Sequence, residues 1–274
     1  MSKKSKDNKL KQSASDKIYI IRKNIQKIMF YIISFGMFFS LYEISRLLHW
    51  VDPSLLPSLT QVGHALINGM HNGSFYVDIY WSIRRVVIGF VTGIIMAVGV
   101  GFVMGYFKLI RYLFDPIMSF LRALPPIALI PLAVIIMGIG ETSKISVLIY
   151  ASFFPAVVII YQGLTNLNPL YIRAAKCLGT DSQEMFIRII LPQMVPHFIT
   201  ACRVSLGVCW ATLVAAEMIA ARRGLGAMII NSMNFFQIPP VVLGIFLIGF
   251  ISLLIDSLVR YIERKLTFWQ EKIG

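Results

Sequence analysis

The chain has 274 residues, of which 57% are hydrophobic and 14% are charged, and its mean hydropathy is +0.73. This composition excludes a water-soluble globular domain and indicates an integral membrane protein with one membrane domain. The net charge of +13 does not indicate a nucleic-acid-binding protein, because the basic tail MSKKSKDNKLKQ is short and lacks interleaved aromatic residues.

We predict an all-α, polytopic bundle of about six membrane spans, since about 20 apolar residues cross the roughly 30 Å of hydrocarbon in a bilayer. The third span is short, or continuous with residues 116–124, because Pro125-Pro126 interrupts it. If it is re-entrant, five spans remain. The apolar stretches lie near residues 28–47, 86–107, 126–139, 145–163, 195–219 and 240–259.

Lys and Arg residues indicate how these spans are oriented. Nine of the 26 lie in residues 1–27, three in 108–122, three in 164–193 and four in 260–274. Six spans place these four segments on one side, and loops rich in Lys and Arg are typically cytoplasmic. The expected domains are a cytoplasmic basic tail and lead-in (1–27), a transmembrane domain (28–260) and a cytoplasmic carboxy-terminal tail (261–274).

The stretch between the first two spans, residues 48–83, is expected on the outer side. Ser58 and Gln61 have the spacing of a capping box, which predicts a helix beginning there. Asn72-Gly73 marks a turn after it. We interpret this helix as interfacial, and docking of an external partner is the alternative.

Glycine and proline residues shape the second and third spans. The pairs Gly89/Gly93 and Gly101/Gly105 have the spacing that lets membrane helices pack closely. Asp115-Pro116 predicts a helix start, with the aspartate as cap and the proline in the first turn. The break at Pro125-Pro126 has two interpretations, a structural kink or a bend that moves as a gate.

Residues 169–190 are a water-soluble helical hairpin between apolar segments. Asn168 is a candidate N-cap, and Pro169 suits the first helical position. Gly179 is the expected terminator after Leu178, because it adopts left-handed backbone angles without a Cβ clash. Thr180 and Gln183 then have capping-box spacing, with Asp181 favourable at the positive helix end. The second helix runs to Leu191-Pro192, where proline ends it or opens the next span.

This hairpin resembles the EAA loop of ABC importer permeases. The resemblance rests on the spacing of Ala174-Ala175, Gly179, Ile189 and Leu191-Pro192. Further likeness lies in MGIGETSKIS, RVSLGVCWATLVAAEMIAARRGLG and RKLTFW, and it covers roughly residues 45–270. These segments are similar to type I permeases of the taurine, sulfonate, nitrate and bicarbonate family, most of all the taurine permeases. One departure is Arg173, which stands where the family has a glutamate, so any ion pair of that glutamate does not carry over.

The resemblance implies a non-catalytic permease subunit in a bacterial cell membrane. A second copy, two ATP-binding subunits, an extracytoplasmic solute-binding protein and membrane lipid are the implied partners. No cofactor is expected on this chain, since it has no GxxxxGK[ST] loop, and ATP with Mg²⁺ would bind the partner subunit. The residues expected to contact that subunit are Arg173, Ala174, Ala175, Leu178, Gly179, Thr180, Asp181, Met185 and Phe186.

Polar residues inside spans are candidates for the translocation pathway or its gate, because unpaired charges there are costly. Arg203 either faces the pathway or pairs with helix carbonyls or Asp256. Glu217 either forms an ion-pair cluster with Arg222 and Arg223 or acts as a gate. Trp210 and Thr212 either line the path or pack. Arg84-Arg85 is expected to reach toward lipid headgroups.

The substrate favoured by the resemblance is a small anionic or zwitterionic solute, taurine or another alkanesulfonate. Nitrate, bicarbonate and a vitamin precursor are rivals within the same family. A self-sufficient secondary transporter is a further alternative, but repeat symmetry and ion-coupling carboxylates are not evident. A membrane enzyme is disfavoured because the four histidines are scattered without a metal-binding motif.

Overall fold

The computed structural model describes residues 29–31, 33–48 and 56–266. Every regular element in these ranges is helical, as predicted for an all-α protein. The predicted tail 1–27 and residues 267–274 of the carboxy-terminal tail lie outside the described residues. Two compact units are distinguished, residues 1–61 and 62–274.

In the first unit, residues 29–31 and 33–47 are helical and most of their large apolar side chains are exposed. This helix corresponds to the predicted first span, with residue 32 outside the described residues. The predicted capping box is confirmed. Gln61 Oε1 accepts from the Ser58 backbone N–H at 2.9 Å and Ser58 Oγ accepts from the Gln61 N–H at 3.2 Å, which starts α2 (Leu59–His71).

In the second unit, four helices of the described chain are long and apolar enough to cross a membrane: α3 (Ser74–Tyr106), α6 (Glu141–Thr165), the continuous helix Ser182–Ala220, and α11 (Ile238–Leu266). A fifth candidate is bent by 85°. It consists of α4 (Lys108–Ala123) followed by η1 (Pro126–Leu129) and α5 (Ile130–Met137). The predicted break at Pro125-Pro126 is thus confirmed, because neither proline can continue the hydrogen-bond ladder of α4.

Helix α3 begins at Ser74, directly after the Gly73 turn, so it extends beyond the apolar stretch predicted near residues 86–107, and Phe75 of its first turn is buried in a hydrophobic cluster with Val62 and Leu243. One sequence-based boundary is wrong. Asp115-Pro116 does not start a helix, since Pro116 lies inside α4. Asp115 instead accepts a hydrogen bond from the Tyr161 hydroxyl of α6, so a tertiary contact replaces the predicted cap.

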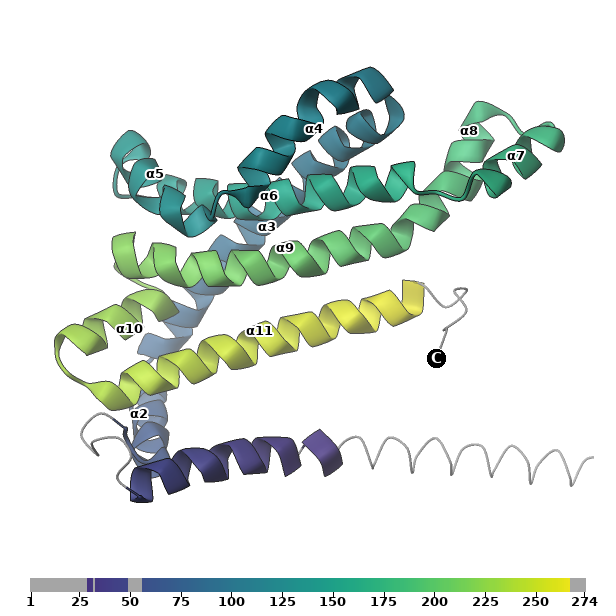
Figure 1. Cartoon of the computed structure of the whole chain (residues 1–274). Coiled ribbons are helices and arrows are strands. Elements are labelled where there is room, and N and C mark those ends of the chain that lie inside the picture. The colour runs from purple at the N-terminus through teal and green to yellow at the C-terminus, as the bar shows by residue number, and fades with distance from the viewer. Residues whose placement is uncertain (1–28, 32, 49–55, 267–274) are drawn as a thin grey trace, which may run out of the picture. The chain divides into compact units, whose positions relative to one another are not determined.

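Helix α6 is the centre of the bundle. It packs against α3 on one side and α9 (Leu191–Ala220) on the other, while α10 (Leu225–Asn234) packs on α9 and α11. Figure 1 shows α6 and α9 lying side by side along most of their length, with α3 crossing them. The fully buried residues of α6, including Leu148, Ala151 and Val157, fill this contact.

The predicted glycine pairs are the points where α3 and α6 touch. A Cβ on Gly93 would overlap Ser152 Oγ and lie 2.8 Å from the Ile149 carbonyl, and one on Gly101 would lie 2.8 Å from the Ile160 side chain. Gly99, on another face of α3, has open space around it. Close packing, rather than a ligand, is therefore the role of the stripe.

We expect Gly93→Ala to destabilise the purified chain by about 1–3 kcal/mol, because the new methyl group must push α6 away. The matched variant Gly99→Ala should be neutral or stabilise by about 0.5–1 kcal/mol, since alanine is the better helix former. Both can be measured by denaturant unfolding in detergent, with thiol labelling of the buried Cys209 as the reporter and with Cys177 and the partly buried Cys202 replaced by serine. Equal stability of the two variants would contradict this packing.

Candidate functional site

The helical hairpin of α7 (Pro169–Cys177) and α8 (Ser182–Met185) extends beyond the ends of α6 and α9 (Figure 1). Its beginning is as predicted. Asn168 Oδ1 accepts from the Leu170 backbone N–H at 2.9 Å, and Pro169 is the first helical residue. The cap satisfies one of the N–H groups that a helix start leaves without a partner.

The turn between the two helices is closed by Gly179, as predicted. Its φ of +77° lies in the left-handed region. The Thr180 N–H donates to the Ala175 carbonyl at 3.2 Å and the Gly179 N–H to the Lys176 carbonyl at 3.1 Å. These two bonds form a Schellman motif. The direction in which α8 leaves α7 therefore depends on one residue with positive φ.

The predicted capping box of Thr180 and Gln183 is wrong. Helix α8 has Asp181 as its N-cap, without a side-chain cap hydrogen bond. A capping box requires the side chain at the third helical position to reach the cap's backbone N–H. At Thr180 that N–H is already bound to the Ala175 carbonyl, so the Schellman motif takes the donor that the box needs.

The second helix of the hairpin does not end at Leu191-Pro192. It passes through a short π-helical segment, η2 (Phe186–Ile190), into α9, so that Ser182–Ala220 is one helix of 39 residues. Pro192 has no N–H to offer the preceding turn, and wider i→i−5 bonding, as from the Leu191 N–H to the Phe186 carbonyl, accommodates such a residue. Of the two predicted outcomes, the proline opens the next span.

The outer face of the hairpin is apolar and exposed. Leu170 is 66% and Leu178 85% exposed, and Arg173 and Ala174 beside them are exposed as well. Large exposed apolar side chains in an otherwise polar loop indicate a surface that contacts another protein. Gly179 and Asp181 are also exposed, and Thr180 is half-buried.

Other predicted contact residues pack wholly or partly against the chain itself, although Phe186 is still 40% exposed. Ala175 is buried and Met185 is half-buried. The Phe186 ring lies 5.7 Å from the ring of Phe102 on α3, and Phe102 in turn contacts Phe198 of α9. This aromatic cluster holds the base of the hairpin on α3 and α9.

The predicted pathway residues are scattered. Arg203 pairs with Asp256 at 3.4 Å, as one prediction stated, and with Glu263 of α11 at 3.3 Å. Trp210 and Thr212 are buried within the chain, and Thr212 Oγ1 donates to the Val208 carbonyl. Glu217 is fully buried, far along α9 from the hairpin. The structure does not bring these four residues together, and their lining of a pathway stays a prediction.

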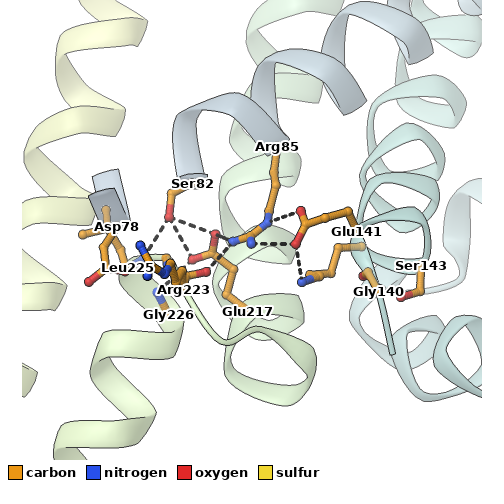
Figure 2. A network of polar contacts seen from close by, with 12 residues as sticks. Asp78, Ser82, Arg85, Gly140, Glu141, Ser143, Glu217, Arg223, Leu225 and Gly226 are labelled. Atoms are coloured by element: carbon orange, nitrogen blue, oxygen red, sulfur yellow. Dashed lines mark hydrogen bonds and ion pairs between the residues drawn. The ribbon is translucent and has the colours of Figure 1, made fainter. Parts of the chain in front are cut away.

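Glu217 is the centre of a buried charge network at the end of the bundle opposite the hairpin (Figure 2). Arg85 of α3, 2% exposed, donates from Nη1 to Glu217 Oε1 at 2.7 Å. It also forms a bidentate pair with Glu141 of α6, at 2.7 and 2.8 Å. Lys144 donates to the same glutamate at 2.7 Å. Three helices are thus joined by one guanidinium, whose fork geometry suits two carboxylates.

The Ser82 hydroxyl and several backbone groups complete the network. Ser82 Oγ donates to Glu217, and the Gly226 N–H donates to Glu217 Oε2 at 2.9 Å. The Arg223 carbonyl accepts from Arg85 at 2.6 Å. A Cβ on Gly224, whose φ is +129°, would lie 2.5 Å from the Glu217 carboxylate. The loop from α9 to α10 is therefore folded over the ion pair.

Two sequence interpretations are corrected by this network. Arg85 does not reach toward headgroups, because it is the buried partner of Glu217. The ion-pair partners predicted for Glu217, Arg222 and Arg223, have exposed side chains, and Arg223 joins the network only through its carbonyl. Ser82, Glu141 and Lys144 were missed. Arg85 carried a signal, since it lies four residues before Gly89 on the packed face of α3.

The chain is similar to several known membrane transport proteins. Residues 89–268 match the family of binding-protein-dependent transport system inner membrane components. A probable ABC transporter permease protein of Brucella abortus (strain 2308) is 39% identical over 218 residues, 80% of this chain and 87% of the relative. The taurine transport system permease protein of Escherichia coli (strain K12) is 35% identical over 82% of this chain and 84% of its own.

A more distant relative and a solved structure are also similar to this chain. A nitrate import permease protein of Synechocystis is 28% identical over 72% of this chain and 71% of the relative. Among solved structures, the MetNI methionine ABC transporter in an inward-facing conformation has the same fold, with a TM-score of 0.60 and 18% identity. That match covers 69% of this chain and 94% of the other. The chain therefore belongs to the family of inner membrane components of binding-protein-dependent transport systems, the non-catalytic permease subunits of type I ABC importers.

Proposed function

We propose that two copies of this chain form the pathway of an ATP-driven importer for a small anionic or zwitterionic solute. An extracytoplasmic solute-binding protein delivers the solute, and two ATP-binding subunits dock on the hairpins at 169–190. The observation that carries this proposal is the hairpin itself. Its exposed apolar face offers a docking surface, and its second helix continues without interruption into α9.

This continuity supplies a mechanical link. When ATP binding closes the two ATP-binding subunits on each other, the two hairpins move toward each other. Because Ser182–Ala220 is a single helix, movement at its cytoplasmic end tilts α9 and the helices packed on it, and the pathway changes from inward-facing to outward-facing. Hydrolysis of ATP and release of the products return it to the inward-facing state.

The charge network keeps the moving part together. Arg85 ties α3, α6 and α9 at the end remote from the hairpin, while the glycine stripe holds α3 on α6 along its length. In this proposal the three helices tilt as one body. Glu217 stabilises their packing rather than opening or closing the pathway. Arg203, paired with α11, links that helix to the same body.

ATP and Mg²⁺ act on the partner subunit in this proposal, and this chain binds no cofactor. Both termini and the hairpin face the cytoplasm, which the distribution of Lys and Arg supports. Taurine or another alkanesulfonate is the favoured solute, supported by the likeness to the taurine permease. Nitrate, supported by the likeness to the nitrate permease, is the alternative, together with bicarbonate or a vitamin precursor.

Replacement of Gly179 tests the docking hairpin. We expect Gly179→Val to uncouple ATP hydrolysis from transport in the reconstituted assembly, because a β-branched residue strains the left-handed turn that aims α8. Gly179→Asn should retain most of the coupling, since asparagine tolerates positive φ. Nothing lies within 4 Å of a Cβ at this position, so a clash does not explain the difference. Normal coupling in the valine variant would argue against the role of the hairpin.

The solute can be identified by uptake into proteoliposomes that contain the permease, its ATP-binding subunit and its solute-binding protein. We expect ATP-dependent accumulation of labelled taurine that unlabelled alkanesulfonates suppress at lower concentrations than nitrate or bicarbonate. If nitrate competes best, the solute assignment is replaced but the importer remains. Accumulation without ATP would instead indicate a secondary transporter.

Replacement of Glu217 distinguishes a structural role of this residue from a gating role. We expect Glu217→Ala to reduce the free energy of unfolding by on the order of 3 kcal/mol, because it leaves Arg85 buried with one carboxylate fewer. Glu184→Ala, which removes an exposed pair at 3.4 Å, should change it by less than about 1 kcal/mol. Unfolding is followed through Cys209 labelling. A Glu217→Ala chain of unchanged stability that fails to transport would show a gate.

A further inference from the structure

Next to the charge network lies a cavity of about 470 Å³ that the proposed transport cycle does not yet use. Trp81 and Arg85 of α3 form one wall, and Gly140, Glu141 and Lys144 at the start of α6 form another. The third wall comes from the loop after α9, with Arg222 and Arg223. Ile139 and Ala220 complete the lining. Its volume falls in the range of small-molecule sites.

Positive charge predominates on these walls. Arg85, Lys144, Arg222 and Arg223 line the cavity, against one carboxylate, Glu141. Arg85 and Lys144 are both buried and are matched by Glu217 and Glu141. The remaining charges are Arg222 and Arg223, which are exposed. Arg223 interacts electrostatically with Asp78, whereas Arg222 has no ion-pair partner among the described residues. Asp78 lies beyond Arg223, beside a neighbouring cavity.

The hydrogen-bond donors of Lys144, which lines the cavity, are only partly used. The Lys144 ammonium has three N–H groups, and the one hydrogen bond seen goes to Glu141. An ammonium held at 4% exposure interacts strongly with an anion, because little water screens it. Trp81 and Ile139 add an apolar surface that a short carbon chain can contact.

The position of the cavity is informative. It opens beside the first residue of α6, whereas the hairpin follows the last. Since α6 has 25 residues, the two sites lie roughly 37 Å apart along it, about the thickness of a membrane. If the hairpin is cytoplasmic, as the proposed function requires, the cavity is on the outer side, where the solute arrives.

We propose that this cavity is an entry site that binds the anionic group of the transported solute, a small oxyanion of the sulfonate or nitrate type. Arg222 and Arg223 donate to its oxygens from the loop, and Lys144 donates from α6. Charge-assisted hydrogen bonds of this kind favour oxyanions over neutral or cationic solutes. The inference rests on the proposed function for the direction of transport and adds the place where the anionic group of the solute binds.

Direct binding tests the proposal without transport. The permease is purified with its ATP-binding subunits, without nucleotide and without solute-binding protein, and titrated with methanesulfonate at constant ionic strength. We expect a saturable fluorescence change that is absent in Trp81→Phe. Nitrate should compete, whereas urea and choline should not.

Two matched variants locate the binding. Arg222→Gln with Arg223→Gln should raise the half-saturating concentration about tenfold or more, since two charge-assisted donors are lost. Arg84→Gln, at an exposed arginine that contacts the Trp81 ring but does not line the cavity, should leave the half-saturating concentration unchanged. All three positions are exposed, so folding is preserved.

Absence of a saturable Trp81 signal, or equal binding by the double variant, would overturn the proposal. The proposal would also be overturned if the double variant bound methanesulfonate normally but no longer bound the solute-binding protein. The two arginines would then be a docking site for that protein. These outcomes are separate from failure of the proposed function. That function fails if ATP-driven uptake is absent while the cavity still binds anions.

Discussion

The pairing of Arg85 with Glu217 is the constraint on which the arrangement of this bundle depends. Both side chains are buried in a helical bundle whose outer surface is apolar, so each charge needs a partner that the fold itself supplies. The pair fixes the ends of α3 and α9, and Glu141 brings in α6. The loop after α9 is fixed as well, since its backbone donors and acceptors bind the same groups.

Close helix packing extends this constraint along the bundle. The face of α3 that contains Arg85 continues through Gly89, Gly93 and Gly101. In lipid, where apolar side chains gain little by leaving their surroundings, such backbone approach is the main source of helix association. A rigid three-helix body results. The hairpin is joined to this body through α9 by an unbroken helix, so in the proposed function a partner that moves the hairpin moves the whole body.

Local signals made much of this fold predictable. The Asn168 cap, the Gly179 turn and the Ser58/Gln61 capping box involve residues close in sequence, and each formed as expected. Competing contacts explain the errors. The Thr180 N–H was taken by the Schellman motif, and Asp115 was taken by Tyr161 on another helix.

The charge network was harder to predict, because Arg85, Glu141 and Glu217 are far apart in sequence and their pairing depends on three-dimensional packing. The helical periodicity of α3 would have identified Arg85 as a buried residue. Spacing by four places Arg85, but not Arg84, on the glycine face of α3, which indicates burial. The pathway residues remain predictions for a different reason. In the proposed assembly two copies line the pathway, and the structure of one chain does not define that lining.

The central claim is that an ATP-binding partner docks on this chain at the hairpin and that the hairpin is cytoplasmic. Chemical labelling of Cys177 on α7 tests this claim most directly. This thiol is exposed in the single chain and adjoins Leu178 on the docking face. A membrane-impermeant maleimide should modify Cys177 in inverted vesicles but not in intact spheroplasts, with Cys177→Ser as the blank. The ATP-binding subunit should block the reaction. Modification from the outside, or an undiminished reaction in the assembled complex, would contradict the account.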